Sequence, residues 1–293
     1  MPIIHMSDQF PKISIVTPTF NQGNFIEESI LSVIGQKYPN LEYIIMDGGS
    51  TDNSMEVIKK YEQHITYFTS QKDDGMYDAL NRGFKKATGE IMGWLNSDDL
   101  LLNKSLFTLA DIFQNNADVE WLQGYPCMAD ESGRIVFQRP QRSSRFSFYR
   151  KEYHDGIFIQ QESTYWRRSL WEKSGASISS DYKYAGDFEL WMRFYKYAEQ
   201  FITPALIGAF RLRKGQQSEK YYPSYLQECD QVIDLHIKEL PNEDKVILKK
   251  LNLERKYTWI SALVRRFGFL NYTNEKQKMV AYDNEKGKFV KSR

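Results

Sequence analysis

The sequence lacks the features of a secreted or membrane-spanning protein. Among its 293 residues are two cysteines, Cys127 and Cys229, whose distant and unrelated positions build neither a disulfide framework nor a zinc motif. Residues 1–11 lack the charged and then apolar pattern of a signal peptide, and no apolar run approaches the roughly 20 residues that span a bilayer. We therefore expect a cytoplasmic protein, which could also lie at the inner face of the membrane.

The sequence also lacks an excess of charge and a glycine-rich nucleotide loop. Its 39 Lys and Arg residues are balanced by 38 Asp and Glu residues, whereas nucleic-acid-binding proteins usually carry a strong basic excess. No G-x-G-x-x-G pattern follows the first expected strand, so a Rossmann dehydrogenase is disfavoured. Residues 17–21 (TPTFN) are also unlike the basic, Gly-rich loop that opens a sugar nucleotidyltransferase. No nucleic-acid partner is expected.

The sequence does contain alternating strand and helix patterns over its first 118 residues. Short apolar, β-branched runs at 12–17, 41–46, 65–69 and 90–95 predict strands. Segments with apolar residues at helical spacing separate these runs. The alternation predicts an α/β fold with a mainly parallel sheet flanked by helices, in which ligands bind beyond the carboxyl ends of the strands.

Three acidic residues lie where such a fold places its ligands. Asp98, in Asn-Ser-Asp-Asp after the fourth strand, could hold Mg²⁺ or Mn²⁺ with a diphosphate, or could cap the next helix. Asp47 follows the second strand and could bind a nucleobase or ribose, or could serve the Asp-Gly-Gly turn. Asp187 begins an aromatic helix and could act as a general base or as a helix cap. Taken singly, each residue leaves both alternatives open.

Six segments between residues 12 and 215, taken together, favour the functional roles of these acidic residues over the structural ones. They are 14–21 (SIVTPTFN), 47–52 (DGGSTD), 73–83 (DDGMYDALNRG), 87–90 (ATGE), 94–99 (WLNSDD) and 186–193 (GDFELWMR). In this order and at this spacing they resemble the inverting family 2 glycosyltransferases, which have the GT-A fold, a Rossmann-like sheet flanked by helices. Each segment alone is weak evidence, but six in order are a strong signal.

The resemblance implies roles for individual residues. Asp98 is similar to the metal-binding carboxylate of the family's Asp-x-Asp motif, and Asp187 is similar to the catalytic base. The residues that the resemblance places around the nucleotide sugar are Thr17, Pro18 and Thr19 beside the base, Asp47 at the base or ribose, and Asp73 and Asp78.

Two positions depart from the family pattern. Asn96 stands where the first Asp of the Asp-x-Asp motif is expected, so it brings a hydrogen-bonding amide but no charge. Arg213 stands near the late strand where many relatives carry a metal-binding His. Because Arg cannot ligate a metal but can pair with phosphate, we expect the ion to arrive largely with the donor and Arg213 to help neutralise the diphosphate.

The expected function is therefore metal-dependent, inverting transfer of a hexose-type sugar from a nucleotide-diphosphate donor, UDP-linked by the resemblance, to an acceptor hydroxyl. The resemblance places this activity in cell-surface polysaccharide or glycan assembly, with a glycan or a lipid-linked sugar as the acceptor. The alternative is a nucleotide-binding scaffold that has lost activity, which Asn96 and Arg213 keep open. We expect a catalytic domain over 1–215, with 12–118 for the nucleotide sugar and 119–215 for the acceptor.

The rest of the chain, 216–293, is expected to be a helical extension with a flexible, polar tail. Residues 259–270 carry an apolar helical stripe that could lie on an anionic membrane or pack onto the catalytic domain. The basic stretch 139–151 could meet the phosphates of a lipid-linked acceptor or be a solvated loop.

Overall fold

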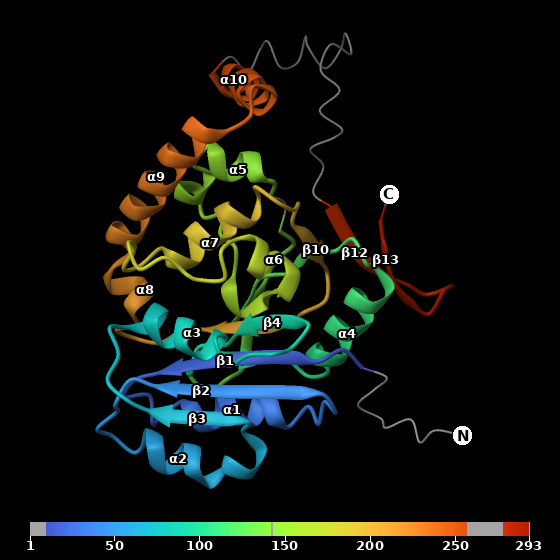
Figure 1. Ribbon diagram of the computed structural model, residues 1–293. Coiled ribbons are helices and arrows are strands. Elements are labelled where there is room, and N and C mark those ends of the chain that lie inside the picture. The colour runs from blue at the N-terminus through green and yellow to red at the C-terminus, as the bar shows by residue number, and fades with distance from the viewer. Residues whose placement is uncertain (1–9, 142, 257–277, 293) are drawn as a thin grey trace.

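A nine-stranded, mostly parallel sheet forms the centre of the molecule (Figure 1). The computed structural model describes residues 10–141, 143–256 and 278–292. The strands lie in the order β13-β12-β10-β6-β9-β4-β1-β2-β3, and β9 runs antiparallel to both of its neighbours. No helix in this described part of the chain is long and apolar enough to cross a lipid bilayer.

The first half of the chain builds one side of this sheet by strand–helix alternation, as predicted. Strand β1 pairs in parallel with β2 on one edge and with β4 on the other. It is buried along its whole length because neighbours cover both its edges and both its faces. The elements are β1 (Ile13–Thr19), α1 (Ile26–Ile34), β2 (Leu41–Asp47), α2 (Ser54–Lys60), η2 (Glu62–His64), β3 (Tyr67–Ser70), α3 (Met76–Phe84), β4 (Ile91–Trp94) and α4 (Ser105–Asn115).

The second half completes the central sheet and adds a smaller one. Strand β9 inserts between β4 and β6 and so joins the two halves. The four-stranded second sheet has the order β5-β11-β7-β8. The elements are β5 (Leu100–Leu101), β6 (Trp121–Gly124), β7 (Cys127–Ala129), β8 (Ile135–Gln138), α5 (Arg145–Tyr149), η3 (Glu152–Asp155), η4 (Gln161–Ser163), β9 (Thr164–Arg167), α6 (Arg168–Lys173), α7 (Gly186–Phe194), β10 (Phe201–Thr203) and β11 (Gly208–Arg211).

The end of the chain differs from the expected flexible tail, and that prediction was wrong. After α8 (Gln217–Lys220), α9 (Tyr222–Glu239) and α10 (Asn242–Lys256), strands β12 (Lys278–Asp283) and β13 (Lys288–Lys291) extend the central sheet. Val280 is fully buried in the core, and Lys291 pairs with Asp118 at 2.7 Å. The hairpin combines lysines with apolar residues, so Val280 can pack into the core while pairing with β10 satisfies part of the β12 backbone. The stripe at 259–270 lies outside the described residues.

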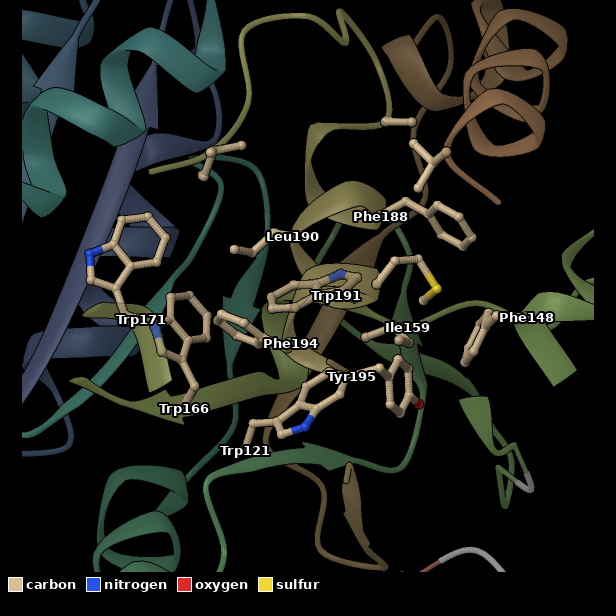
Figure 2. Packing of buried hydrophobic residues seen from close by; sticks show 14 of the residues in the cluster. Trp121, Phe148, Ile159, Trp166, Trp171, Phe188, Leu190, Trp191, Phe194 and Tyr195 are labelled. Atoms are coloured by element: carbon tan, nitrogen blue, oxygen red, sulfur yellow. The ribbon is translucent and has the colours of Figure 1, made fainter. Parts of the chain in front are cut away.

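Aromatic side chains fill the core between the sheet and helix α7 (Figure 2). The Trp191 ring on α7 stacks on Trp94 with centroids 5.5 Å apart and on Trp121 with centroids 5.9 Å apart. Trp166 on β9 meets the same ring edge to face. Because such contacts between large rings are both apolar and directional, they fix α7 and therefore the residues at its start.

Candidate active site

The strand ends converge as the α/β pattern predicts. Strands β1, β2 and β3 are in register so that Thr19, Asp47 and Ser70 lie side by side across the sheet at their carboxyl ends. The arrowheads of these strands point to one side of the molecule, the side on which α8 lies (Figure 1). The predicted site residues lie in six places: on the end of β1 (Thr17, Pro18 and Thr19), on the end of β2 (Asp47), between β3 and the first turn of α3 (Asp73 and Asp78), after β4 (Asn96 and Asp98), at the start of α7 (Asp187) and after β11 (Arg213).

Asp47 organises the turn that follows β2. One carboxylate oxygen accepts hydrogen bonds from Gly49 N at 3.2 Å, Ser50 N at 2.9 Å and the Ser70 hydroxyl at 2.5 Å. The other accepts from the Ser50 hydroxyl. Asp47 is buried, with 2% of its surface exposed, so its side chain stabilises the turn whatever else it binds. A contact with the nucleotide stays a prediction.

Asp73 packs against the same turn, while Asp78 is paired within its own helix. A Cβ on Gly48 would lie 2.7 Å from an Asp73 oxygen, so glycine at 48 lets this carboxyl approach the β2 turn. Burial raises the pKa of Asp73, and the nearby carboxylate of Asp78 adds to the rise. Asp78 forms an ion pair with Arg82 at 2.5 Å. Asp73 therefore faces the strand ends more directly than Asp78 does.

Asp98 and Arg213 form an ion pair at the carboxyl end of β4. The Nε and Nη2 atoms of Arg213 both lie 2.8 Å from the same oxygen of Asp98, and the guanidinium lies over the Phe25 ring with its centre 5.2 Å from the ring centroid. The two residues predicted to meet the metal and the diphosphate are thus in direct contact. Arg213 holds the carboxylate by one oxygen and leaves the other outside this ion pair.

Asn96 and Asp99 lie beneath this ion pair. The Asn96 amide donates to Asp99 at 3.1 Å, and its own oxygen is buried without a hydrogen-bond partner among the described residues. Burial, together with the charges of Asp98 and Glu162, raises the pKa of Asp99 well above its usual range. Asn96 therefore supplies a hydrogen-bonding group beside Asp98 without adding another negative charge.

Sequence analysis missed Arg211, which holds the loop bearing Asp98. Its side chain is fully buried and donates to the Asp98 carbonyl at 2.6 Å, the Glu131 carbonyl at 2.7 Å and the Glu28 carboxylate at 2.7 Å. Its backbone N–H donates to Asp99 at 2.9 Å. The alternation of Arg211 and Arg213 along the late strand was the available signal, since successive odd positions share one face.

Glu162 is a second buried charge that sequence analysis placed only in a general acceptor region. It has 2% of its surface exposed, and one of its oxygens has no hydrogen-bond partner in the described chain. Burial raises its pKa, and the Asp98 charge adds to the rise. The neighbouring Gln160 and Gln161 bind the backbone at Cys127 and Trp94, so this segment joins β4 to the second sheet.

The donor atoms around Asp98 decide whether this site fits a divalent metal. The described residues contain no group of three or more His, Cys, Asp or Glu side chains arranged to hold an ion. Asp98 has one oxygen outside its ion pair with Arg213, and Asn96 adds a neutral amide. This donor set does not fit an ion held by protein alone. It fits an ion that takes most of its oxygen ligands from a diphosphate and one from Asp98.

Asp187 lies at the start of α7, next to the hydroxyl of Tyr77 on α3. The Tyr77 hydroxyl is 3.2 Å from an Asp187 carboxylate oxygen and accepts a hydrogen bond from Asp187 N at 3.3 Å. A Cβ at Gly186 would lie 2.8 Å from the Tyr77 ring, so glycine there permits this approach. Burial raises the pKa of Asp187 to about 6, although hydrogen bonds from Phe188 N–H and Tyr77 lower it. A carboxylate in this state is a stronger base than an exposed one.

The basic stretch 139–151 contains paired cations and a short helix, α5. Arg145 pairs with Asp244 at 2.8 Å, and Lys151 pairs with Asp234 at 2.9 Å. Arg139 donates to the Gly156 carbonyl. These pairings link the stretch to the C-terminal helices. Contact with the phosphates of an acceptor remains an untested alternative.

Comparison with known proteins places the chain in a family. The model for "Glycosyl transferase family 2" matches residues 14–174. An uncharacterized glycosyltransferase of Rickettsia typhi is 26% identical over 247 residues, covering 82% of this chain and 76% of the relative. The putative teichuronic acid biosynthesis glycosyltransferase TuaG of Bacillus subtilis is 28% identical over 131 residues, covering 43% of this chain and 51% of the relative.

Solved structures show the same fold. TarS of S. aureus (1–349) in complex with UDP-GlcNAc aligns with a TM-score of 0.66 at 20% identity, covering 84% of this chain and 73% of that one. The mannosyltransferase PcManGT of Pyrobaculum calidifontis, in complex with GDP-Man and Mn²⁺, aligns with a TM-score of 0.53 at 16% identity, covering 86% and 83%. The predicted family, fold class and enzyme class are confirmed. The chain belongs to glycosyl transferase family 2 and is a glycosyltransferase with the GT-A fold.

Proposed function

We propose that this enzyme transfers a sugar from a UDP-linked donor to an acceptor hydroxyl, with inversion at the anomeric carbon, in the assembly of a cell-surface polysaccharide. The match to TuaG supports the polysaccharide, and the complex of TarS with UDP-GlcNAc supports the uridine nucleotide. Residues 12–118 hold the nucleotide sugar and 119–215 supply the acceptor side. The observation that carries the proposal is Asp187, a half-buried carboxylate with a raised pKa that contacts Tyr77 in the first turn of α3.

In this proposal the reaction begins at Asp187. Its carboxylate accepts the proton of the acceptor hydroxyl as the oxygen forms its bond to the anomeric carbon. The bond from that carbon to the diphosphate oxygen breaks on the opposite face, which inverts the stereochemistry. Arg213 contacts Asp98 through two nitrogen atoms in the ion pair. In the reaction it turns its guanidinium to the departing diphosphate. Asp98 would hold a divalent ion, Mn²⁺ or Mg²⁺, which would further neutralise the charge of the diphosphate.

Replacing Asp187 with Asn tests the proposed base. The amide keeps the shape of the side chain but cannot accept the acceptor proton, so turnover should fall by about 10²-fold or more while UDP binding is retained. The measurement is UDP release from a panel of UDP-sugars with Mn²⁺, together with calorimetry of UDP binding.

Glu189→Gln is the matched control, because Glu189 lies on the same helix and pairs with Arg193 at 2.8 Å. It should keep near-normal turnover. Near-normal turnover by the Asp187→Asn variant would remove Asp187 from this role.

A further inference from the structure

Helix α9 places one carboxylate against the segment that leads into Asp187. The Oε2 atom of Glu228 accepts hydrogen bonds from Tyr184 N and Ala185 N, both at 2.8 Å, and Oε1 accepts from Lys183 N at 3.2 Å. Three consecutive backbone N–H groups thus converge on one ionised side chain. Charge-assisted bonds of this kind are roughly twice as strong as neutral ones, so the segment is fixed relative to α9.

The fixed segment is linked to Asp187 through Tyr77. The Tyr77 hydroxyl is 2.8 Å from the carbonyl oxygen of Tyr184 and 3.2 Å from a carboxylate oxygen of Asp187. A hydroxyl has one proton, so these two acceptors compete for it. The shorter distance favours the Tyr184 carbonyl. As long as Tyr184 is held in place, Asp187 keeps more of its capacity to accept a proton from elsewhere.

We propose that Glu228 is a positioning residue, which holds residues 183–185 so that the Tyr77 proton stays with the Tyr184 carbonyl and Asp187 remains free to act as the base. The proposal rests on the proposed role of Asp187. Glu228 lies on α9, 54 residues beyond the end of the family-model match at residue 174. In this proposal a helix outside the matched region therefore affects the reaction through Glu228.

The groups that face Asp187 come from two elements. Tyr77 faces it from α3, and Tyr225, Glu228 and Cys229 face it from α9. Burial raises the pKa of Tyr77, Tyr225 and Cys229, so these three groups are neutral at the pH where Asp187 titrates. The negative charge of Glu228 contributes to the raised pKa of Asp187. Loss of the Glu228 charge would lower the pKa of Asp187. Release of the Tyr77 proton towards Asp187 would lower it too, so both changes favour the carboxylate form of Asp187.

Glu228→Gln provides the test, with UDP release and hydrogen exchange as the readouts. The UDP-sugar that the unmodified enzyme turns over fastest serves as the donor. We expect kcat to fall by about tenfold with an unchanged KM for the donor, since a misplaced base affects the chemical step. The acid limb of the pH profile should move to lower pH, because activity is lost as pH falls through the now lower pKa of Asp187. Peptides covering residues 183–187 should exchange faster.

Two control variants and a second test variant separate positioning from general loosening of α9. Glu239→Gln breaks an exposed pair with Lys196, and Asp230→Asn removes the charge that pairs with Lys151 at 3.3 Å; both residues lie on the same helix as Glu228. Neither should move the acid limb. Tyr77→Phe removes the proton that the proposal releases towards Asp187, so the acid limb should move less when Glu228→Gln is added to Tyr77→Phe than when Glu228→Gln is made alone.

Each outcome decides the proposal. Unchanged exchange at residues 183–187 in the Glu228→Gln variant would overturn it, with or without turnover data. Faster exchange with an unchanged acid limb and unchanged kcat would also overturn it. An equal shift of the acid limb in Asp230→Asn would show that only loosening of α9 matters and would reject a specific role for Glu228. Full activity of Asp187→Asn would instead reject the proposed base, while the exchange data would still report on the contact made by Glu228.

Discussion

At the scale of single residues, the ion pair of Arg213 with Asp98 predicts how this enzyme binds a diphosphate. An Arg213→Ala variant should bind UDP roughly 10- to 100-fold more weakly, because a hydrogen bond to a charged group contributes about 1.5–3 kcal/mol. Binding of uridine, which lacks phosphate, should change little. Calorimetry with both ligands measures the difference.

Arg134→Ala is the matched control for this experiment. Arg134 lines the same surface depression as Arg213, and it forms an exposed pair with Asp130 at 2.7 Å. Its loss should leave UDP binding unchanged. An equal loss of affinity for uridine and UDP in Arg213→Ala would show that the arginine supports the pocket rather than the phosphates.

The same scale shows what the sequence could predict about the site. Asp98 and Asp187 were predicted as site residues because each belongs to a local sequence motif, and their roles stay predictions. Arg211 and Glu228 act across the chain: Arg211 binds Glu28 from 183 residues away, and Glu228 binds a segment more than 40 residues earlier. The spacing of Arg211 and Arg213 could have placed these two side chains on one face, but no local pattern identifies Glu28 or residues 183–185 as partners, so only the fold reveals these contacts.

At the scale of secondary-structure elements, the β12–β13 hairpin predicts a stability effect at the far edge of the sheet. Val280 is fully buried, so Val280→Ala should lower the free energy of unfolding by about 1–2 kcal/mol, the cost of two lost methyl groups and the space they leave. Urea unfolding measures this change. Val136→Ala on β8 makes the same chemical change at a side chain that is 55% exposed, and it should cost much less. Equal effects would mean that the hairpin does not pack on the core.

Elements were predictable to the extent that their own apolar residues specify them. Strands β1 and β2 are mostly apolar and buried because parallel strands inside a sheet are covered on both faces, and their runs were found in the sequence. The hairpin at the chain end was missed because its apolar residues form two short runs, 279–282 and 289–290, between lysine and aspartate residues, and because its pairing with β10 is a long-range contact. The insertion of β9 between β4 and β6 is likewise a matter of partners, not of local pattern.

At the scale of the whole molecule, the region proposed to meet the diphosphate is assembled from both halves of the chain. Asp98 follows β4 in the first half, Arg211 ends the late strand β11, Arg213 follows it, and Glu28 comes from α1. Neither half holds the loop of Asp98 alone. Arg211 is buried and paired with Glu28, whereas Arg213 pairs with Asp98 nearer the surface, so Arg213 is the cation placed to meet an anion.

The pairing of Asp98 with Arg213 predicts that metal binding depends on the nucleotide. Mn²⁺ alone should not raise the melting temperature, because the described residues offer Asp98 already paired with Arg213 and no cluster of acidic ligands around it. UDP with Mn²⁺ should raise it by about 5–10 °C at concentrations near 100 times the dissociation constant, and by more than UDP alone. Asp98→Asn should abolish the increment due to Mn²⁺ but not the effect of UDP, whereas Asp118→Asn, at an exposed pair with Lys291, should change neither. Tight binding of Mn²⁺ without nucleotide would show instead that the protein itself holds the ion, and Arg213 would then have to leave Asp98 before any donor arrives.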